Sequence, residues 1–389
     1  MKRPVVNFYG IALPTMLIGI LGLVMVYSAS SVKALEESGS SFAIVGRQAL
    51  LFVVGIVVAL FLFRTPSAFL SRISSLSLLL SVVALALPQT PLGKEVNGNT
   101  NWISLGGFTL QPSEFAKLGL VLWMAGLLAR HEDRKNSPGG ESGSQLMAQL
   151  IPGLAVMLGL ILLGDDLGTA MVFAAIAAGM LFVAGVQIRW FLAGISALAL
   201  MALVFILIQP NRIYRIKALL DPFSEENYQN AGWQPAHSVM GLASGGIFGS
   251  GLGAGKQKWG NLAEAHTDFI FAVIGEEMGL LGTLTLLALF AFLLLSIFKI
   301  AMRTSTLLEK FFVAGIGIWT AVQVMVNIGS VTGLIPVIGV TLPLVSYGGS
   351  SLLATFAALG LVLGVAMRDP EVKREVTRRV ARALKYSEK

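Results

Sequence analysis

Residues 280–298 read LLGTLTLLALFAFLLLSIF, a run of 19 residues without a charged side chain. A run of this length crosses the hydrocarbon core of a bilayer as an α-helix, whereas surface helices of soluble proteins carry a polar face. Similar apolar runs recur from one end of the chain to the other. The stretch therefore predicts a polytopic membrane protein and excludes a water-soluble globular one.

Composition supports the same fold class. Hydrophobic residues make up 55% of the 389 residues and charged residues only 13%, while soluble domains carry about 25% charged residues. The apolar runs are continuous and do not alternate as the strands of a membrane β-barrel do, so an all-α fold is expected. The absence of cysteine excludes disulfides, thiolate metal sites and cysteine nucleophiles.

Ten transmembrane helices are predicted, in a single membrane domain of residues 1–389. The first apolar run is longer than the hydrophobic part of a signal peptide, so we expect a permanent helix there. A large extracytoplasmic loop, 209–267, separates the seventh and eighth helices. The spans cover residues 9–28, 43–63, 70–88, 111–129, 146–163, 168–187, 190–208, 268–298, 311–330 and 350–367.

Basic residues are distributed unevenly between the two sides of the membrane. The even number of spans places both termini on one side, and that side holds 19 of the 28 Lys and Arg residues. Cytoplasmic segments carry an excess of Lys and Arg, so both termini are expected in the cytoplasm.

The tail 368–389 is a basic segment in which Val372, Val376, Val380 and Leu384 follow i, i+4 spacing. It predicts an amphipathic helix. This helix either binds anionic lipid or a partner protein, or it only ends the last span and exposes its charged face to water.

Several ionisable side chains fall inside or between the spans, where charge is costly and indicates function by default. Arg47 either binds an anion such as a phosphate or extends to the headgroups. Glu114 and Lys117, three residues apart, form either a structural ion pair or part of a polar cavity. Asp165 and Asp166 either hold a divalent cation or form a tight turn capped by Asp166; the turn is favoured, because adjacent acids rarely share one ion.

The loop 209–267 holds seven glycines between residues 241 and 255 but no Gly-Lys-Ser/Thr, so it is not a phosphate loop. Its stretch 239–252 is too apolar for a free linker and too rich in glycine for an ordinary span. A re-entrant or interfacial segment that lines a cavity is expected there.

Acidic residues crowd the entrance of the eighth span. On a helix that starts near Asp268, Glu276 lies about 80° around and about 12 Å deeper, so both can face one polar cavity while Glu277 points elsewhere. Asp268 is interpreted either as a helix N-cap or as a general base, because partial burial raises the pKa of a carboxyl group towards neutrality. From the residues alone, both transport and catalysis remain open.

Several motifs, in this order, resemble the SEDS family of cell-wall proteins, which includes FtsW, RodA and SpoVE. The resemblance runs over nearly the whole chain. The motifs are Asn97-Gly98 with Trp102-Ile103, QPSEFAK at 111–117, DLGT at 166–169, Ser244-Gly245-Gly246 with Gly251-Leu252-Gly253, HTDFIF at 266–271, Glu276-Glu277 and the uncharged segment from Leu342 to Ser351.

The resemblance implies a lipid II polymerase, a peptidoglycan glycosyltransferase at the outer face of the bacterial cytoplasmic membrane. The 4-hydroxyl of a GlcNAc attacks the anomeric carbon of a lipid-linked MurNAc, and undecaprenyl diphosphate leaves with inversion. Asp268 matches the family's essential aspartate, proposed as general base. The candidates for neutralising the diphosphate are Arg47, Lys117, Arg212 and Arg215. The other substrate-binding candidates are Trp102, Glu114, His266, Glu276 and Ser346.

The resemblance also implies partners: a class B penicillin-binding protein (an FtsI-like transpeptidase) and other membrane proteins of the division machinery, but no nucleic acid. No ligand set for a metal is visible, and Mg²⁺ or Mn²⁺ would enter with the diphosphate. The rival interpretations are a lipid II flippase or other lipid transporter, and a scaffold without catalysis.

Within the family, MVYSASS at 25–31 and Lys258-Trp259-Gly260 resemble the division member FtsW more than the elongation member RodA, which implies a place at the septum. Three positions depart from the family pattern. Gly164-Asp165 stands where the family usually has Glu or Gln followed by Pro. Ala263 stands where a Pro is common, and Asn101 stands where an Arg often precedes the tryptophan. The departures weaken a role for Asp166 and remove one phosphate ligand, but they leave Asp268 unaffected.

Overall fold

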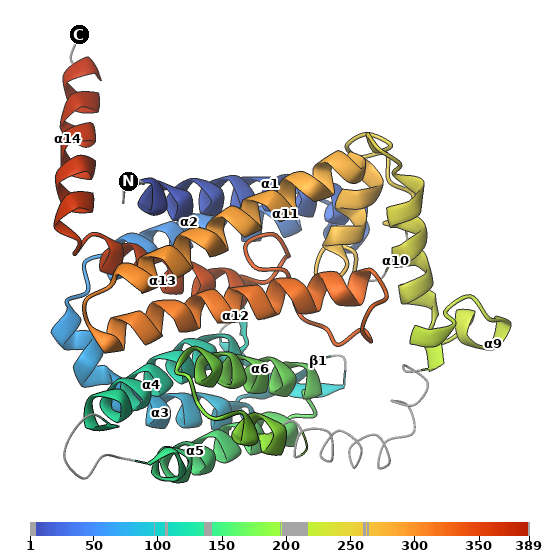
Figure 1. The fold of residues 1–389 in the computed structure, drawn as a ribbon. Helices are drawn as coiled ribbons and strands as arrows, with labels where there is room; N and C mark the ends of the chain where they lie inside the picture. The colour runs from blue at the N-terminus through green and yellow to red at the C-terminus, as the bar shows by residue number, and fades with distance from the viewer. Residues whose placement is uncertain are drawn as a thin grey trace.

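The computed structural model describes residues 5–96, 98–105, 108–135, 142–194, 196, 217–259, 262 and 264–387, which are mostly helical (Figure 1). The long or apolar helices are α1 (Val5–Ser38), α2 (Ala43–Leu62), α3 (Ser67–Ala86), α4 (Pro112–Lys135), α5 (Gly143–Leu163), α6 (Leu167–Val183), α11 (Ile270–Arg303), α12 (Leu307–Val331) and α13 (Gly349–Ala366). Other described helices are η1 (Leu87–Gln89), α9 (Glu225–Tyr228), α10 (Trp233–Ser244) and α14 (Pro370–Ser387).

Nine of the ten predicted spans coincide with these helices. Eight described helices are long and apolar enough to cross a membrane, and α6 is a shorter apolar helix of 17 residues. The seventh predicted span, 190–208, lies mostly outside the described residues, which include only 190–194 and 196 of it, so the count of ten stays a prediction.

The helices divide into an inner and an outer set. Most of α4, α12 and α13 is buried, whereas α2, α3 and α5 expose apolar side chains over most of their length, as lipid-facing helices do. Small residues allow the two sets to approach closely, which is typical of membrane bundles. At Gly360 of α13, for example, an added Cβ atom would lie only 2.5 Å from the carbonyl oxygen of Ala59 in α2, so only glycine allows this close approach.

Figure 1 shows the N-terminus and the start of α14 at one end of the bundle, called the inner end here. The opposite, outer end carries β1, α9 and α10. This arrangement agrees with the prediction that both termini lie on one side.

The loop between α3 and α4 folds into a small antiparallel sheet, a local addition to the all-α membrane fold. Its strands are β1 (Gly93–Val96), β2 (Asn99–Leu105) and β3 (Phe108–Leu110), in the order β1-β2-β3. In register, Lys94 faces Trp102 and Ser104 faces Thr109. The strands have four, seven and three residues, which is too short to give a clear alternating pattern.

α11 bends sharply at Gly279, where φ is 66° and ψ is −163°. A side chain is strained at this φ, and a Cβ atom would lie 2.3 Å from the backbone nitrogen of Gly249. The bend separates a short first part, 270–278, from the longer part that runs to the inner end (Figure 1).

The stretch 239–252 is half helix and half loop. α10 ends at Ser244, and the glycine-rich loop that follows packs on the first part of α11. The backbone N–H groups of Ser250 and Gly251 donate to the carbonyl oxygens of Glu276 and Glu277, at 2.9 and 3.0 Å. The segment lies at the outer end of the bundle, which fits the interfacial alternative.

Candidate functional site

Asp268 lies directly before α11, where α12 meets the outer loop 332–348. The helix starts after Phe269, and no described residue donates a hydrogen bond to the Asp268 carboxylate, so Asp268 is not an N-cap. Asn327 Nδ2 donates to the backbone oxygens of Asp268 and Val340, at 2.8 Å each. The main chain is therefore fixed while the carboxylate keeps its hydrogen-bonding capacity.

The pKa of Asp268 is raised from 3.8 to about 7. Desolvation by burial is the largest cause, and the nearby carboxylates of Glu264 and Asp166 raise the pKa further, because a second negative charge disfavours ionisation. A carboxyl group with this pKa can take up and release a proton near neutral pH.

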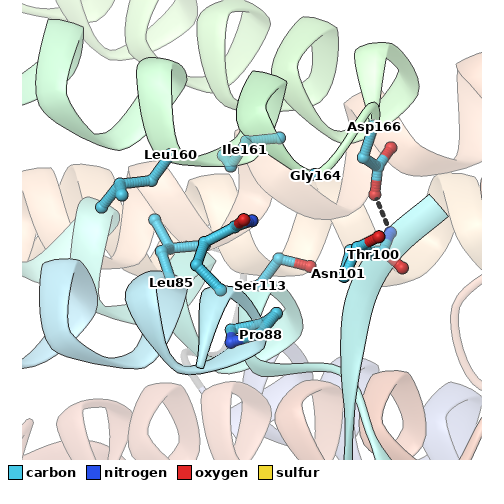
Figure 2. Close-up of a pocket in the computed structure, with 10 residues that line it drawn as sticks. Leu85, Pro88, Thr100, Asn101, Ser113, Leu160, Ile161, Gly164 and Asp166 are labelled. Carbon is cyan, nitrogen blue, oxygen red and sulfur yellow. Dashed lines mark hydrogen bonds between the residues drawn. The ribbon is translucent and has the colours of Figure 1, made fainter. Parts of the chain in front are cut away.

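Asp166 caps α6, as the favoured interpretation of the turn predicted. Its carboxylate accepts from the backbone N–H and the hydroxyl of Thr169, at 2.8 and 2.7 Å. Asn101 Nδ2 of β2 also donates to Asp166 (Figure 2). Gln111 Nε2 donates to Asp166 at 3.5 Å. Asp165, in the turn itself, has a φ of 59°. The cap ties the start of α6 to the sheet.

A small pocket opens beside this cap. Asn101, Ser113 and Asp166 supply its polar lining, and Leu85, Leu160 and Ile161 supply apolar walls (Figure 2). The Ser113 hydroxyl and Asn101 Oδ1 are buried without a hydrogen-bond partner among the described residues. The start of α6 also reaches the Asp268 region, because a Cβ atom on Gly168 would lie 2.3 Å from the carbonyl oxygen of Ile338.

Ser346 holds together the two outer segments that flank Asp268. Its hydroxyl donates to the carbonyl oxygen of Thr267 at 2.6 Å and accepts from the backbone N–H of Leu342 at 2.8 Å. Gln48 of α2 donates to the carbonyl oxygen of Ser346 at 3.1 Å and accepts from the N–H of Gly348 at 3.4 Å. The start of α2 is therefore bound to the segment that precedes α13.

His266 is buried beside Tyr347, with 5.5 Å between the ring centroids. Desolvation lowers the pKa of His266 below its usual value, and the positive charge of Lys33 lowers it further, while Glu264 and Glu37 act in the opposite sense. A lowered pKa favours the neutral imidazole, which can both donate and accept a hydrogen bond.

Glu114 and Lys117 form the predicted ion pair, with 2.7 Å between Lys117 Nζ and Glu114 Oε1. Both side chains are buried, and Lys117 Nζ also lies 5.4 Å from the ring centroid of Trp319 in α12. The second oxygen, Glu114 Oε2, is buried with no hydrogen-bond partner among the described residues. The ammonium of Lys117 is thus neutralised within the protein.

Glu276 does not have the geometry that the helical spacing predicted, whereas Glu277 does. Glu276 accepts from the backbone N–H of Lys256 at 2.7 Å, so it binds the glycine-rich loop and not a cavity shared with Asp268. Glu277 does point elsewhere, into a cluster called the clasp here: Glu277, Lys258 and Ser28. Lys258 Nζ lies 2.7 Å from Glu277, and the Ser28 hydroxyl donates to Glu277 at 2.6 Å.

The other candidates are spread over the outer half of the molecule. Arg47 is exposed on the second turn of α2, next to Gln48, and Trp102 is partly exposed on β2. Arg212 and Arg215 lie outside the described residues. Within the described chain, no group of three or more His, Cys, Asp or Glu side chains is arranged to hold a metal ion.

The structure thus brings Asp268, Asp166 and His266 into one region of the outer end. Sequence reasoning gave no role to Asn101 or Asn327. A single amide leaves no periodic pattern; the only available signal for Asn327 was a polar amide inside an apolar span.

The fold and this acidic site define a polytopic helical membrane protein with a polar centre at its outer end. The chain belongs to the family described as "Cell cycle protein", that of FtsW, RodA and SpoVE, which matches residues 10–371.

Relatives and solved structures agree with this membership. The chain is 37% identical over 370 residues to the "Probable peptidoglycan glycosyltransferase FtsW" of Mycobacterium tuberculosis, covering 95% of this chain and 69% of the relative. One similar solved chain comes from work described as "Structural coordination of polymerization and crosslinking by a peptidoglycan synthase complex", with a TM-score of 0.74, 31% identity and coverage of 92% and 97%. Another is RodA of Thermus thermophilus, with a TM-score of 0.67, 31% identity and coverage of 93% and 96%.

Proposed function

We propose that the chain is a peptidoglycan glycosyltransferase that polymerises lipid II at the outer face of the bacterial cytoplasmic membrane, with Asp268 as general base. The name of the similar protein from Mycobacterium tuberculosis states this glycosyltransferase activity. The observation that carries the proposal is the Asp268 carboxylate itself, which lies at the outer end without a described hydrogen-bond donor and has a pKa near 7. These are the properties of a group that takes a proton from a substrate.

In the proposed step, Asp268 accepts the proton of the 4-hydroxyl of an acceptor GlcNAc. The oxygen of this hydroxyl forms a bond to the anomeric carbon of a lipid-linked MurNAc, opposite the leaving group. The bond from that carbon to the diphosphate breaks, and undecaprenyl diphosphate leaves with the electron pair, so the configuration inverts. A positioned general base contributes about 10²- to 10⁴-fold to such a rate.

Arg47 is the best-supported cation for the diphosphate among the described candidates. It is exposed, and its neighbour Gln48 is bound to the Ser346 segment, which contacts Thr267 beside Asp268. Lys117 is less suited, because its charge is already balanced by Glu114.

Trp102 and the neutral imidazole of His266 remain proposed substrate contacts, since both lie at the outer end. Glu276 and Ser346 are better explained as positioning residues, because their hydrogen bonds are made within the protein.

A divalent cation has no prearranged ligand set among the described residues. Mg²⁺ or Mn²⁺ is therefore proposed only as an ion that binds together with the diphosphate. Titration of either ion into a metal-free assay tests whether the reaction depends on it.

A class B penicillin-binding protein is the proposed partner, and cell division at the septum the proposed setting. The similar chain from a peptidoglycan synthase complex supports the first, and the FtsW name of the relative supports the second.

Glycan-strand formation from purified lipid II, by reconstituted protein with its partner, tests the function. We expect polymer from wild type, none from Asp268→Asn, and normal polymer from Glu95→Gln, a control at an exposed acid of β1. Equal polymer from wild type and Asp268→Asn would remove Asp268 from the chemistry. No polymer from either, with partner bound, would favour a transporter or scaffold, and movement of lipid II between leaflets would separate those two.

A further inference from the structure

α14 does not continue the bundle. The membrane helices run lengthwise between the inner and outer ends, whereas α14 leaves the inner end sideways, across their direction, and extends beyond α1 (Figure 1). A helix that runs across the direction of membrane-spanning helices, at the level of their ends, lies along the membrane surface.

The root of α14 is fixed to the bundle by ion pairs. Arg303, at the end of α11, lies 3.7 Å from Asp369 and 3.5 Å from Glu371. Arg368 pairs with Glu309 of α12 and donates to the carbonyl oxygen of Thr65 at 2.6 Å. The sideways direction is therefore built into the junction.

The next turns keep α14 close to α1. Val372 is buried, with an exposed fraction of 4%, and the guanidinium of Arg379 lies 5.4 Å from the ring centroid of Tyr9.

The charge of α14 is strongly positive on its exposed side. Residues 370–387 contain six Lys and Arg but only two Glu. Both acids are engaged: Glu371 with Arg303, and Glu375 with Arg379 at 3.1 Å. Lys373, Arg374 and Arg378 are exposed, and no described residue forms an ion pair with them.

We propose that α14 lies in the headgroup layer of the cytoplasmic leaflet and binds anionic phospholipid through Lys373, Arg374 and Arg378. The inner end is the cytoplasmic one, because the segments there hold most of the basic residues of the chain. A basic amphipathic helix in this plane places its apolar side against the acyl chains and its cations among the phosphates. An acidic protein surface would offer the same negative charge as the lipid phosphates, but binding to it would not require α14 to lie in the plane of the membrane.

The chain contains no cysteine, so single-cysteine variants allow a direct test. Val376→Cys, on the apolar side, and Thr377→Cys, on the exposed side, carry an environment-sensitive fluorophore in full-length protein reconstituted into nanodiscs. The nanodiscs contain phosphatidylcholine alone or phosphatidylcholine mixed with phosphatidylglycerol. Lys373→Gln/Arg374→Gln/Arg378→Gln is compared with Arg72→Gln, a control at an exposed basic residue of the inner end.

We expect the probe at residue 376 to emit at shorter wavelength, and lipid-attached quenchers to reduce its emission several-fold more, when phosphatidylglycerol is present. The triple variant and high salt should abolish this difference, while Arg72→Gln should retain it. Identical spectra in both lipid mixtures would overturn the proposal, as would equal losses from the triple variant and Arg72→Gln. A shift seen only after addition of a protein partner would also overturn it. Thermal unfolding of each variant shows whether the bundle is intact.

Discussion

At the scale of single residues, the environment of Asp268 separates it from the other acids of the outer end. Asp166 and Glu276 accept hydrogen bonds from within the protein, so their carboxylate oxygens already have partners. Asp268 has no such donor among the described residues, and burial raises its pKa to about 7. Of these three acids, Asp268 is the one whose carboxylate is left to exchange a proton with a bound molecule.

The raised pKa predicts the pH dependence of the reaction. A general base works in its deprotonated form, so the rate at limiting lipid II should rise with pH through about 7 and level off above it. Initial rates of glycan formation across this range, with the partner held constant, measure the profile. A rate that stays constant through pH 7, or falls, would contradict this role of Asp268.

The amino-acid sequence predicted the Glu114–Lys117 pair and the Asp166 cap correctly, because both are made within one helical turn and leave a local pattern. It did not reveal that Asn101 binds Asp166 or that Ser28 binds Glu277, 249 residues away. Contacts between distant segments depend on how helices pack, which spacing along the chain does not encode.

At the scale of elements, the clasp connects α1, the glycine-rich loop and the first part of α11. The side chains of Lys258 and Glu277 are almost completely buried, with exposed fractions of 3% and 0%. Burial without a counter-charge is far more costly for either group than burial of the pair.

The clasp therefore predicts an asymmetric response to mutation. Lys258→Met leaves the Glu277 carboxylate buried and unpaired, and should lower the free energy of unfolding by about 3–5 kcal/mol. The double variant Lys258→Met/Glu277→Gln should be clearly more stable than Lys258→Met alone, because no charge is then stranded. Thermal unfolding in detergent, with Lys256→Met as the exposed control, compares them. Additive losses in the double variant would show that the ion pair is not the stabilising interaction.

Long elements were predictable and short ones were not. A helix that faces lipid needs a continuous apolar run, so hydropathy located nine of the helices. The sheet of residues 93–110 and the bend at Gly279 depend on short turns and on the backbone of the glycine-rich loop, which hydropathy does not register.

At the scale of the whole molecule, the positions of the described helices restrict the path of the chain outside them. Asp166, which caps the start of α6, is bonded to the sheet at the outer end, so α6 runs from the outer to the inner end. α9 and α10 lie at the outer end again (Figure 1). The chain between α6 and α9 should therefore cross the membrane once more, as the predicted count of ten requires.

Cysteine labelling tests this crossing. Gln187→Cys and Asp221→Cys, both at exposed positions of a chain without native cysteine, are treated with a membrane-impermeant maleimide. We expect the reagent to label Asp221→Cys in intact spheroplasts and Gln187→Cys only after permeabilisation. Labelling of both from the same side would show that the seventh span does not exist.

The glycine-rich loop is attached to α11 largely through main-chain groups: the N–H groups of Ser250, Gly251, Gly253 and Lys256 all donate to Glu276 or Glu277. Every amino acid except proline offers the same N–H group, so the exposed side chains of this loop can change without loosening it. The glycines cannot change as freely, because Gly249, Gly251 and Gly253 have positive φ values. The apolar side chains exposed there, Ile247, Phe248, Leu252 and Trp259, do not contribute to that attachment. The outer surface of the loop can therefore differ between homologues on one unchanged frame, provided that the two glutamates, the loop glycines and Lys258 are retained.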